Sequence, residues 1–136
     1  MNKLTGKITQ IQKSGAVMLV DISVDGQGFS ALLIESAAHP DWLQNGKTVD
    51  LMFKETEVSV AKNLSGLLSN RNRMICTVKS INRDELLSRL ELNFGKYVIT
   101  SLITSRAVDA LGIKTGDEVE ALVKANEVSL MKRNEG

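Results

Sequence analysis

A short segment near the end of this 136-residue chain repeats a segment near its middle. The later copy, TGDEVEALVKANEVSLMK, covers residues 115–132, and the earlier copy, NGKTVDLMFKETEVSVAK, covers residues 45–62. Matching positions lie 70 residues apart, and the same ungapped register continues back to the start of the chain. An internal repeat constrains the architecture more than any local pattern does. The chain is therefore predicted to be a tandem duplication.

The duplication predicts two domains, at residues 1–68 and 69–136. Units of this size are near the lower limit for a self-sufficient hydrophobic core. They are therefore expected to pack against each other or against further subunits, which favours a homo-oligomer. The composition, with 43% hydrophobic and 24% charged residues, is ordinary for a globular protein.

Cysteine usage and hydropathy suggest the compartment. Cys76 is the only cysteine, so an intrachain disulfide is impossible, and a reducing environment fits. No apolar stretch approaches the length of a membrane span, and the first residues lack a secretory pattern. These features predict a cytoplasmic protein that does not use a membrane.

Alternation of apolar and polar residues predicts β-strands in both units. The clearest strand covers residues 16–24, and its counterpart covers residues 86–94. One face of each should be buried, with Ala16, Met18, Val20, Ile22 and Val24 in the first unit and Leu86, Ser88, Leu90, Leu92 and Phe94 in the second. Residues 25–26 and 95–96 follow at equivalent positions, and each pair includes a glycine, which predicts hairpin turns.

The rest of each unit is predicted to be strands around one short helix. The remaining strands cover residues 29–34, 48–54 and 57–61 in the first unit and residues 97–103, 118–124 and 127–131 in the second. The last two strands of each unit are expected to close that unit. Five short strands with one small helix predict an all-β fold of two tandem OB-like Greek-key barrels, linked by residues 63–70.

The helix is predicted just before the closing strands. In the second unit it covers residues 104–113, where Thr104 can cap its beginning and Gly112 can end it. The first-unit counterpart covers residues 35–43 and contains Pro40, which should shorten or distort it.

Catalysis finds little support in the side chains. His39 is the only histidine and has no counterpart in the second unit, so we interpret it as structural or exposed. Cys76 falls on a predicted buried strand position, where a thiol is inert. No group of Cys, His and carboxylates has metal-ligand spacing, and no glycine-rich phosphate loop is present. The protein is predicted not to be an enzyme and to need no cofactor.

Nucleic-acid binding is also disfavoured. A net charge of +1 provides no general attraction for phosphates. OB-type barrels that bind single strands need exposed aromatic side chains for stacking. Aromatic residues make up 4% of the chain, and Phe29, Phe53, Phe94 and Tyr97 all fall in predicted strands that need them for the core.

Three features in the second unit could together bind a tetrahedral oxyanion. The segment SNRN, residues 69–72, offers a hydroxyl, backbone N–H groups and a guanidinium. The segment TSRA, residues 104–107, offers hydroxyls and amides at the beginning of a helix, and Lys124 adds a point charge at a strand end. An oxyanion presents only acceptor oxygens, so a site for it is built from donors and cations.

These segments resemble the molbindins, the small Mop-type molybdate-binding proteins with TOBE domains. Their patterns run close to Ser-Ala-Arg-Asn, then Ile-Thr-x-x-Ser, then Leu-Gly-Leu-x-x-Gly, then Val-Lys-Ala. This chain has SNRN, ITSRAVDALGIKTGDEV and VKANEVSLMK in the same order, and the resemblance covers two consecutive Mop units. It implies OB-related barrels that bind molybdate or tungstate without a metal cofactor, at sites that lie between subunits.

Carried over by position, the resemblance implies that Ser69, the backbone amide of Asn70, and Arg71 contact the anion. Thr104 would belong to the helix start of the site, and Lys124 to its closing strands. Two positions depart from the family pattern. Asn70 stands where alanine is usual, which is harmless if only its backbone binds. Ala107 stands where a serine hydroxyl is expected, so one donor is missing.

The first unit departs further from the family pattern. Met1 aligns with Arg71, so the residues before it have no counterparts. Ile34 replaces the threonine, Ala37 stands at the serine position, and Glu35 adds a negative charge. Lys54 is kept and could complete a site opened by the SNRN segment of another unit. Fewer working sites are therefore expected than in a symmetric molbindin.

The resemblance implies a protein that binds molybdate or tungstate for intracellular storage, buffering or homeostasis. A second hypothesis is the ligand-sensing module of a molybdate-responsive regulator or transporter. A third is a barrel that binds another ligand or a protein, if the losses in the first unit reflect a general loss of oxyanion binding. For the assembly, a trimer of two-domain chains and a dimer are both open.

Overall fold

The computed structural model describes residues 1–34 and 40–133. The first-unit elements are β1 (Asn2–Ser14), β2 (Val17–Val24), β3 (Gln27–Ile34), β4 (Thr48–Phe53), the 3-10 helix η1 (Glu55–Glu57) and β5 (Ser59–Ala61). The second-unit elements are β6 (Asn72–Arg83), β7 (Leu87–Phe94), β8 (Tyr97–Thr104), α1 (Ser105–Leu111), β9 (Glu118–Val123), the 3-10 helix η2 (Ala125–Glu127) and β10 (Ser129–Lys132). Each first-unit element has a counterpart 70 residues later, to within one residue at its ends. The predicted repeat is confirmed.

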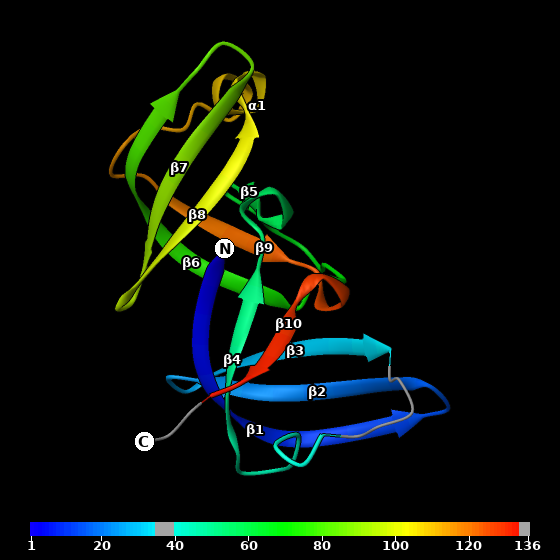
Figure 1. Cartoon of the computed structure of the whole chain (residues 1–136). Helices are drawn as coiled ribbons and strands as arrows, with labels where there is room; N and C mark the ends of the chain where they lie inside the picture. The colour runs from blue at the N-terminus through cyan, green and yellow to red at the C-terminus, as the bar shows by residue number, and fades with distance from the viewer. Residues whose placement is uncertain (35–39, 134–136) are drawn as a thin grey trace.

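The strands form two antiparallel five-stranded sheets, and each sheet contains one strand from the other unit (Figure 1). The order is β10-β4-β1-β2-β3 in one sheet and β5-β9-β6-β7-β8 in the other. The prediction that the last two strands of each unit close that unit was wrong, because β5 pairs with β9 and β10 pairs with β4. The three-residue helices η1 and η2 redirect the chain toward the other sheet, where Val58 and Val128 are buried.

Each sheet curves into a partly open barrel. The register of β1 against β2 shifts between Ile8 and Gln10, and that of β6 against β7 shifts between Val78 and Ser80, again 70 residues apart. Bulges of this kind bend and twist a sheet. The edge strands of each sheet then approach each other, with β10 in contact with β3 and β5 in contact with β8. The predicted all-β, OB-like architecture is confirmed.

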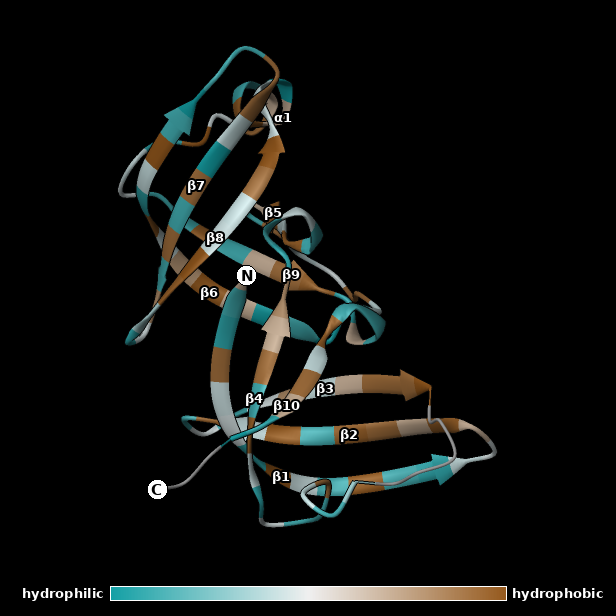
Figure 2. Cartoon of the chain, in the orientation of Figure 1, coloured by the Kyte–Doolittle hydropathy of each residue, from teal (hydrophilic) through white to brown (hydrophobic). Residues whose placement is uncertain are grey.

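The cores follow the predicted alternation (Figure 2). Every second residue of β2 is buried, from Met18 to Val24, and the same face of β7 buries Ser88, Leu90 and Leu92. Two expectations were wrong. Ala16 and Leu86 lie in the turns before β2 and β7 rather than in strands, and Leu86 is 78% exposed.

The predicted helix forms in the second unit. The hydroxyl oxygen of Thr104 accepts a hydrogen bond from the N–H of Ala107 at 3.1 Å, and Gly112 ends α1 with a left-handed φ of 62°. Most of the predicted first-unit helix, residues 35–39, lies outside the described residues. Of the rest, Pro40–Leu43 forms a turn closed by the Leu43 N–H bonded to the Pro40 carbonyl at 3.0 Å.

Two equivalent asparagines join the units. The side chain of Asn72 donates to the carbonyl of Ser30 at 2.9 Å and accepts from its N–H at 2.8 Å. Asn2 makes the same two bonds with Thr100, both at 2.8 Å. Both asparagines are buried, and each satisfies backbone groups on an edge strand, β3 or β8, that no neighbouring strand pairs. The units are therefore held together by polar contacts as well as by exchanged strands.

Replacing Asn72→Ala should lower the free energy of unfolding by about 3 kcal/mol, because it leaves a buried N–H and a carbonyl of β3 without partners. Urea denaturation measures this directly. Asn82→Ala, at an exposed position of the same strand, is the control and should change little. An equal effect of the two substitutions would contradict the role given to Asn72.

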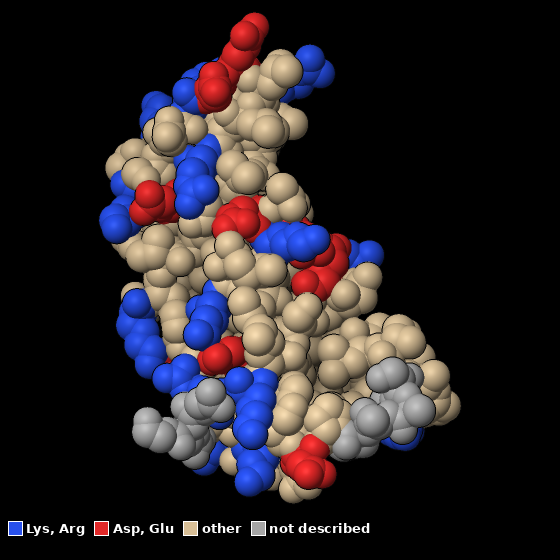
Figure 3. Space-filling view, viewed as in Figure 1, with Lys and Arg blue, Asp and Glu red and all other residues tan. Residues whose placement is uncertain are grey.

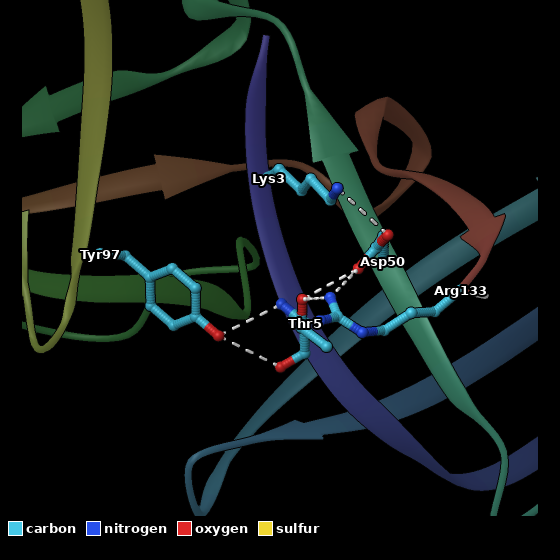
Figure 4. A network of polar contacts seen from close by, with 5 residues as sticks. All are labelled: Lys3, Thr5, Asp50, Tyr97 and Arg133. Atoms are coloured by element: carbon cyan, nitrogen blue, oxygen red, sulfur yellow. Dashed lines mark hydrogen bonds and ion pairs between the residues drawn. The ribbon is translucent and has the colours of Figure 1, made fainter. Parts of the chain in front are cut away.

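Ion pairs and hydrogen bonds of charged side chains hold the exchanged strands β5 and β10 in place. Asp50 of β4 accepts from the hydroxyl of Thr5 at 2.9 Å and from Arg133, just after β10, at 3.2 Å, with Lys3 at 3.4 Å (Figure 4). Burial opposes ionisation of Asp50, but these donors outweigh it and lower its pKa. At the other sheet, Lys62 after β5 pairs with Asp117 at 3.0 Å.

The Asp50→Asn substitution should destabilise the protein by about 2 kcal/mol at pH 7, because a charged acceptor for three donors is lost. Since the pKa of Asp50 is lowered in the folded state, its contribution is present above about pH 4 and disappears as pH falls through that lowered pKa. Urea denaturation at pH 7 and at pH 3 measures the loss of stability and its dependence on pH. The exposed Asp41→Asn is the control, and a deficit that persisted unchanged at pH 3 would argue against the ionic role.

Candidate functional site

Strands β6 and β9 place two basic residues, Arg71 and Lys124, at one corner of the second unit. Their register pairs Asn72 with Val123, so Arg71 and Lys124 lie opposite each other just beyond the last paired residues. Both side chains are exposed. Neither forms a hydrogen bond or ion pair with any residue that the structure describes. We call Arg71, Lys124 and the adjoining Ala125 the second-unit corner.

Several other basic side chains, by contrast, are held by carboxylates. Arg73, two residues from Arg71, forms a two-bond pair with Glu120 at 2.8 and 3.1 Å. Arg83 pairs with Asp109 at 2.6 Å. Figure 3 shows Lys and Arg interspersed with Asp and Glu over the face in view. The second-unit corner is therefore a local arrangement of free donors rather than part of a broad basic surface.

The segment before β6 supplies the other predicted ligands. Ser69 is exposed and Asn70 is half-buried, and both lie in the linking segment, which contains neither helix nor strand. The Oδ1 atom of Asn70 is buried and has no hydrogen-bond partner among the described residues. The linking segment thus leads into the second-unit corner through three consecutive predicted ligands, Ser69, Asn70 and Arg71.

Thr104 lies far from this corner within the same chain. It pairs with Leu87 at the end of the sheet where β6 finishes, whereas Arg71 precedes the start of β6. Because β6 has 12 residues and a strand rises about 3.3 Å per residue, these ends are about 36 Å apart along the strand. One chain therefore does not bring Thr104 together with Arg71 and Lys124.

Around Thr104 the structure forms a groove of about 750 Å³. Its lining residues are Arg83, Glu85, Leu86, Leu87, Thr104, Ser105, Arg106 and Asp109. The oxygen of Thr104 accepts from Ala107, which leaves its O–H as a free donor. Ser105 is buried, with its hydroxyl bonded to the carbonyl of Asp84 at 2.7 Å and 2.8 Å from that of Ser88. Thr104 is therefore the hydroxyl that this groove can offer to a ligand.

The equivalent corner of the first unit contains Lys54 and Met1, which follow and precede the pair of Phe53 with Asn2. Here the backbone N–H of Lys54 donates to Glu57 at 3.1 Å, and Glu55 contacts the nitrogen of Met1. We call Met1, Lys54 and Glu55 the first-unit corner. It keeps the predicted lysine but also holds carboxylates.

Comparisons with known proteins identify the family of this chain. Residues 68–130 match the TOBE domain family. The molybdenum import ATP-binding protein ModC of Brucella abortus is 37% identical over 81 residues, or 59% of this chain and 23% of that protein. The molybdenum transport protein ModE of Herbaspirillum seropedicae is 28% identical over 130 residues, or 93% of this chain and 48% of that protein. The chain thus spans less than half the length of these two relatives.

A solved structure matches almost the whole chain. The cytoplasmic molybdate-binding protein ModG, with molybdate bound, has a TM-score of 0.91 at 30% identity, over 97% of this chain and 96% of that chain. The chain belongs to the molbindin family of TOBE-domain proteins. The resemblance found in the sequence is confirmed, and the match extends over both units of this molbindin.

Two equivalent glutamates meet where the units join in this molbindin. The side-chain carboxyl groups of Glu57 in η1 and Glu127 in η2 lie close enough to influence each other. Burial and the neighbouring Glu57 carboxylate raise the pKa of Glu127, while Lys124 opposes the shift. Ionisation of Glu127 is therefore less favourable than that of a free glutamate.

The Glu127→Gln substitution should stabilise the protein at pH 7 by up to about 1 kcal/mol, because a neutral amide beside Glu57 avoids the burial cost and the charge repulsion that raise the pKa of Glu127. A raised pKa means that the parent protein loses stability as pH rises through it, so the advantage of glutamine should shrink as pH falls. Thermal unfolding from pH 4 to pH 8 tests this, with the exposed Glu118→Gln as the control. A destabilised variant at pH 7 would contradict an unfavourable ionisation of Glu127.

The remaining candidates are residues outside the described part of the chain and one buried cysteine. His39, Glu35 and Ala37 lie outside the described residues. Cys76 is buried, and burial raises the pKa of its thiol to about 12, which leaves it unreactive. Within the described part of the chain, no three His, Cys, Asp or Glu residues are grouped to hold a metal ion. No described helix is long and apolar enough to cross a membrane.

Sequence reasoning missed the roles of two pairs of residues. Asn2 and Asn72 bridge the units, and Glu57 and Glu127 meet where η1 and η2 approach. A signal was available, because each pair is an identical residue at the 70-residue offset. Which unit each side chain would contact depends on the strand exchange, which the repeat alone did not reveal.

Proposed function

We propose that this molbindin binds molybdate or tungstate as the intact oxyanion, for storage, buffering or homeostasis in the cytoplasm. The observation that carries the proposal is the second-unit corner, where the side chains of Arg71 and Lys124 lie opposite each other with no hydrogen-bond or ion-pair partner among the described residues. The fold shared with the molybdate-bound ModG supports the same ligand class. Binding needs no covalent step and no cofactor.

The donors of the second-unit corner suit a tetrahedral dianion. The guanidinium of Arg71 presents several N–H donors in one plane, and the ammonium of Lys124 adds a mobile charge. The hydroxyl of Ser69 and the backbone amide of Asn70 add neutral donors. Charge-assisted hydrogen bonds to an oxyanion are about twice as strong as neutral ones, so the two cations should dominate the affinity.

We propose that a complete site combines two chains. Thr104 lies about 36 Å along β6 from the second-unit corner of its own chain, so a second copy must supply this hydroxyl. Lys54 is the equivalent donor of the first-unit corner. A homo-oligomer, either a trimer of two-domain chains or a dimer, follows from this arrangement. We also propose that residues 1–68 and 69–136 are the duplicated units.

Titration of the purified protein with molybdate, followed by isothermal calorimetry, tests the function. The variants Arg71→Ala and Lys124→Ala should each weaken binding by about tenfold or more, because each removes a charged donor worth about 1.5–3 kcal/mol. Lys47→Ala, an exposed lysine before β4, is the matched control and should bind as the parent does. Sulfate serves as the competing oxyanion.

A saturable molybdate signal that neither substitution weakens would place the site elsewhere. The absence of heat and of thermal stabilisation with both molybdate and tungstate would contradict oxyanion binding.

A second candidate function is a ligand-sensing module of a molybdate-responsive regulator or transporter. It is favoured by the similarity to ModC and ModE, of which this chain spans 23% and 48%. The two functions share a site and differ in partners. A pull-down with and without molybdate separates them, since a sensing module should gain or lose a protein partner when the ligand is added.

A further inference from the structure

The two corners carry different residues on the same backbone. Lys54 and Lys124 occupy equivalent positions at the beginnings of η1 and η2. The next residue is Glu55 in the first-unit corner and Ala125 in the second-unit corner. The strands that frame the corners are equivalent as well, with Asn2 opposite Phe53 and Asn72 opposite Val123. The carboxylate of Glu55 is therefore a specific addition to one of two matching sites.

Glu55 lies among cationic and donor groups. Its carboxylate accepts from the nitrogen of Met1, the residue that aligns with Arg71. This bond holds the pKa of Glu55 below its usual value, and the nearby charge of Arg89 on β7 lowers it further. Lys54 precedes it directly. Glu55 is thus ionised at neutral pH and paired with the nitrogen of Met1.

From this comparison we propose that Glu55 is an internal anion that closes the first-unit corner, and that Ala125 leaves the second-unit corner open to an oxyanion. The inference rests on the proposed function and assigns which of the two corners binds. Its physical basis is that a tethered carboxylate offers the same acceptor oxygens as a free anion and repels a second one. The chain then carries one open corner rather than two.

The electrostatics of the neighbouring glutamates support this asymmetry. In the first unit, Glu57 accepts from the N–H of Lys54, which places a second acidic side chain beside Glu55. In the second unit, among the described residues, no such bond joins the N–H of Lys124 to the side chain of Glu127. The first-unit corner thus contains Glu55 with Glu57 beside it, whereas the second-unit corner has an alanine at the position of Glu55.

Reciprocal exchange of the two residues tests the proposal by calorimetric titration with molybdate. Ala125→Glu should weaken binding by at least about tenfold. Ala125→Gln should weaken it much less, because glutamine has nearly the volume of glutamate but no charge. Glu55→Ala and Glu55→Gln should add a second, weaker binding event per chain. Urea denaturation of each variant verifies that it is folded, and Glu55→Ala tests the idea even if Ala125→Glu does not fold.

Equal losses in Ala125→Glu and Ala125→Gln would overturn the proposal, because volume rather than charge would then close the corner. An unchanged number of molybdates bound by both Glu55 variants would also overturn it. If the parent protein binds molybdate normally in either case, the proposed function stands and only the inference fails. If the parent binds none, the proposed function itself fails.

Discussion

Reciprocal exchange of the last strand is the constraint on which the rest of this structure depends. The last strand of the first unit, β5, belongs to the sheet of the second unit, and β10 belongs to the sheet of the first. Neither unit therefore forms its complete five-stranded sheet without the other. The exchange also fixes the positions of η1 and η2, which connect the two sheets. Lys54 and Lys124 directly precede these helices, so the exchange also fixes the positions of the two corner lysines.

Buried polar groups then make the arrangement specific. Hydrophobic side chains such as those on β2 and β7 would tolerate several ways of stacking two barrels, because apolar contact is not directional. Asn2 and Asn72 are satisfied only when each faces one backbone position of the other unit. An unpaired buried amide is costly, so wrong registers are penalised. Asp50 likewise favours one arrangement, because it accepts a hydrogen bond from Arg133 directly after β10.

The duplication has kept the scaffold and let the two corners diverge. Strands, bulges and bridging asparagines match across the 70-residue offset, because a change in any of them would disturb both sheets. Glu55 and Ala125 are half-buried at the edge of the fold and belong to neither hydrophobic core, so they could differ with little cost to the fold. An asymmetric pair of sites is therefore compatible with a symmetric framework.

The sequence by itself determined the repeat, most strands, the second-unit helix with its caps, and the family. Periodicity, turn glycines and capping residues are local, so they can be read without coordinates. Only the tertiary structure decided that β5 and β10 change sheets, that Arg71 and Lys124 meet, and that Thr104 lies at the far end of β6. These outcomes depend on which strands pair across long sequence separations. A three-residue turn is equally compatible with a hairpin and with a crossing, so no local pattern distinguishes the two.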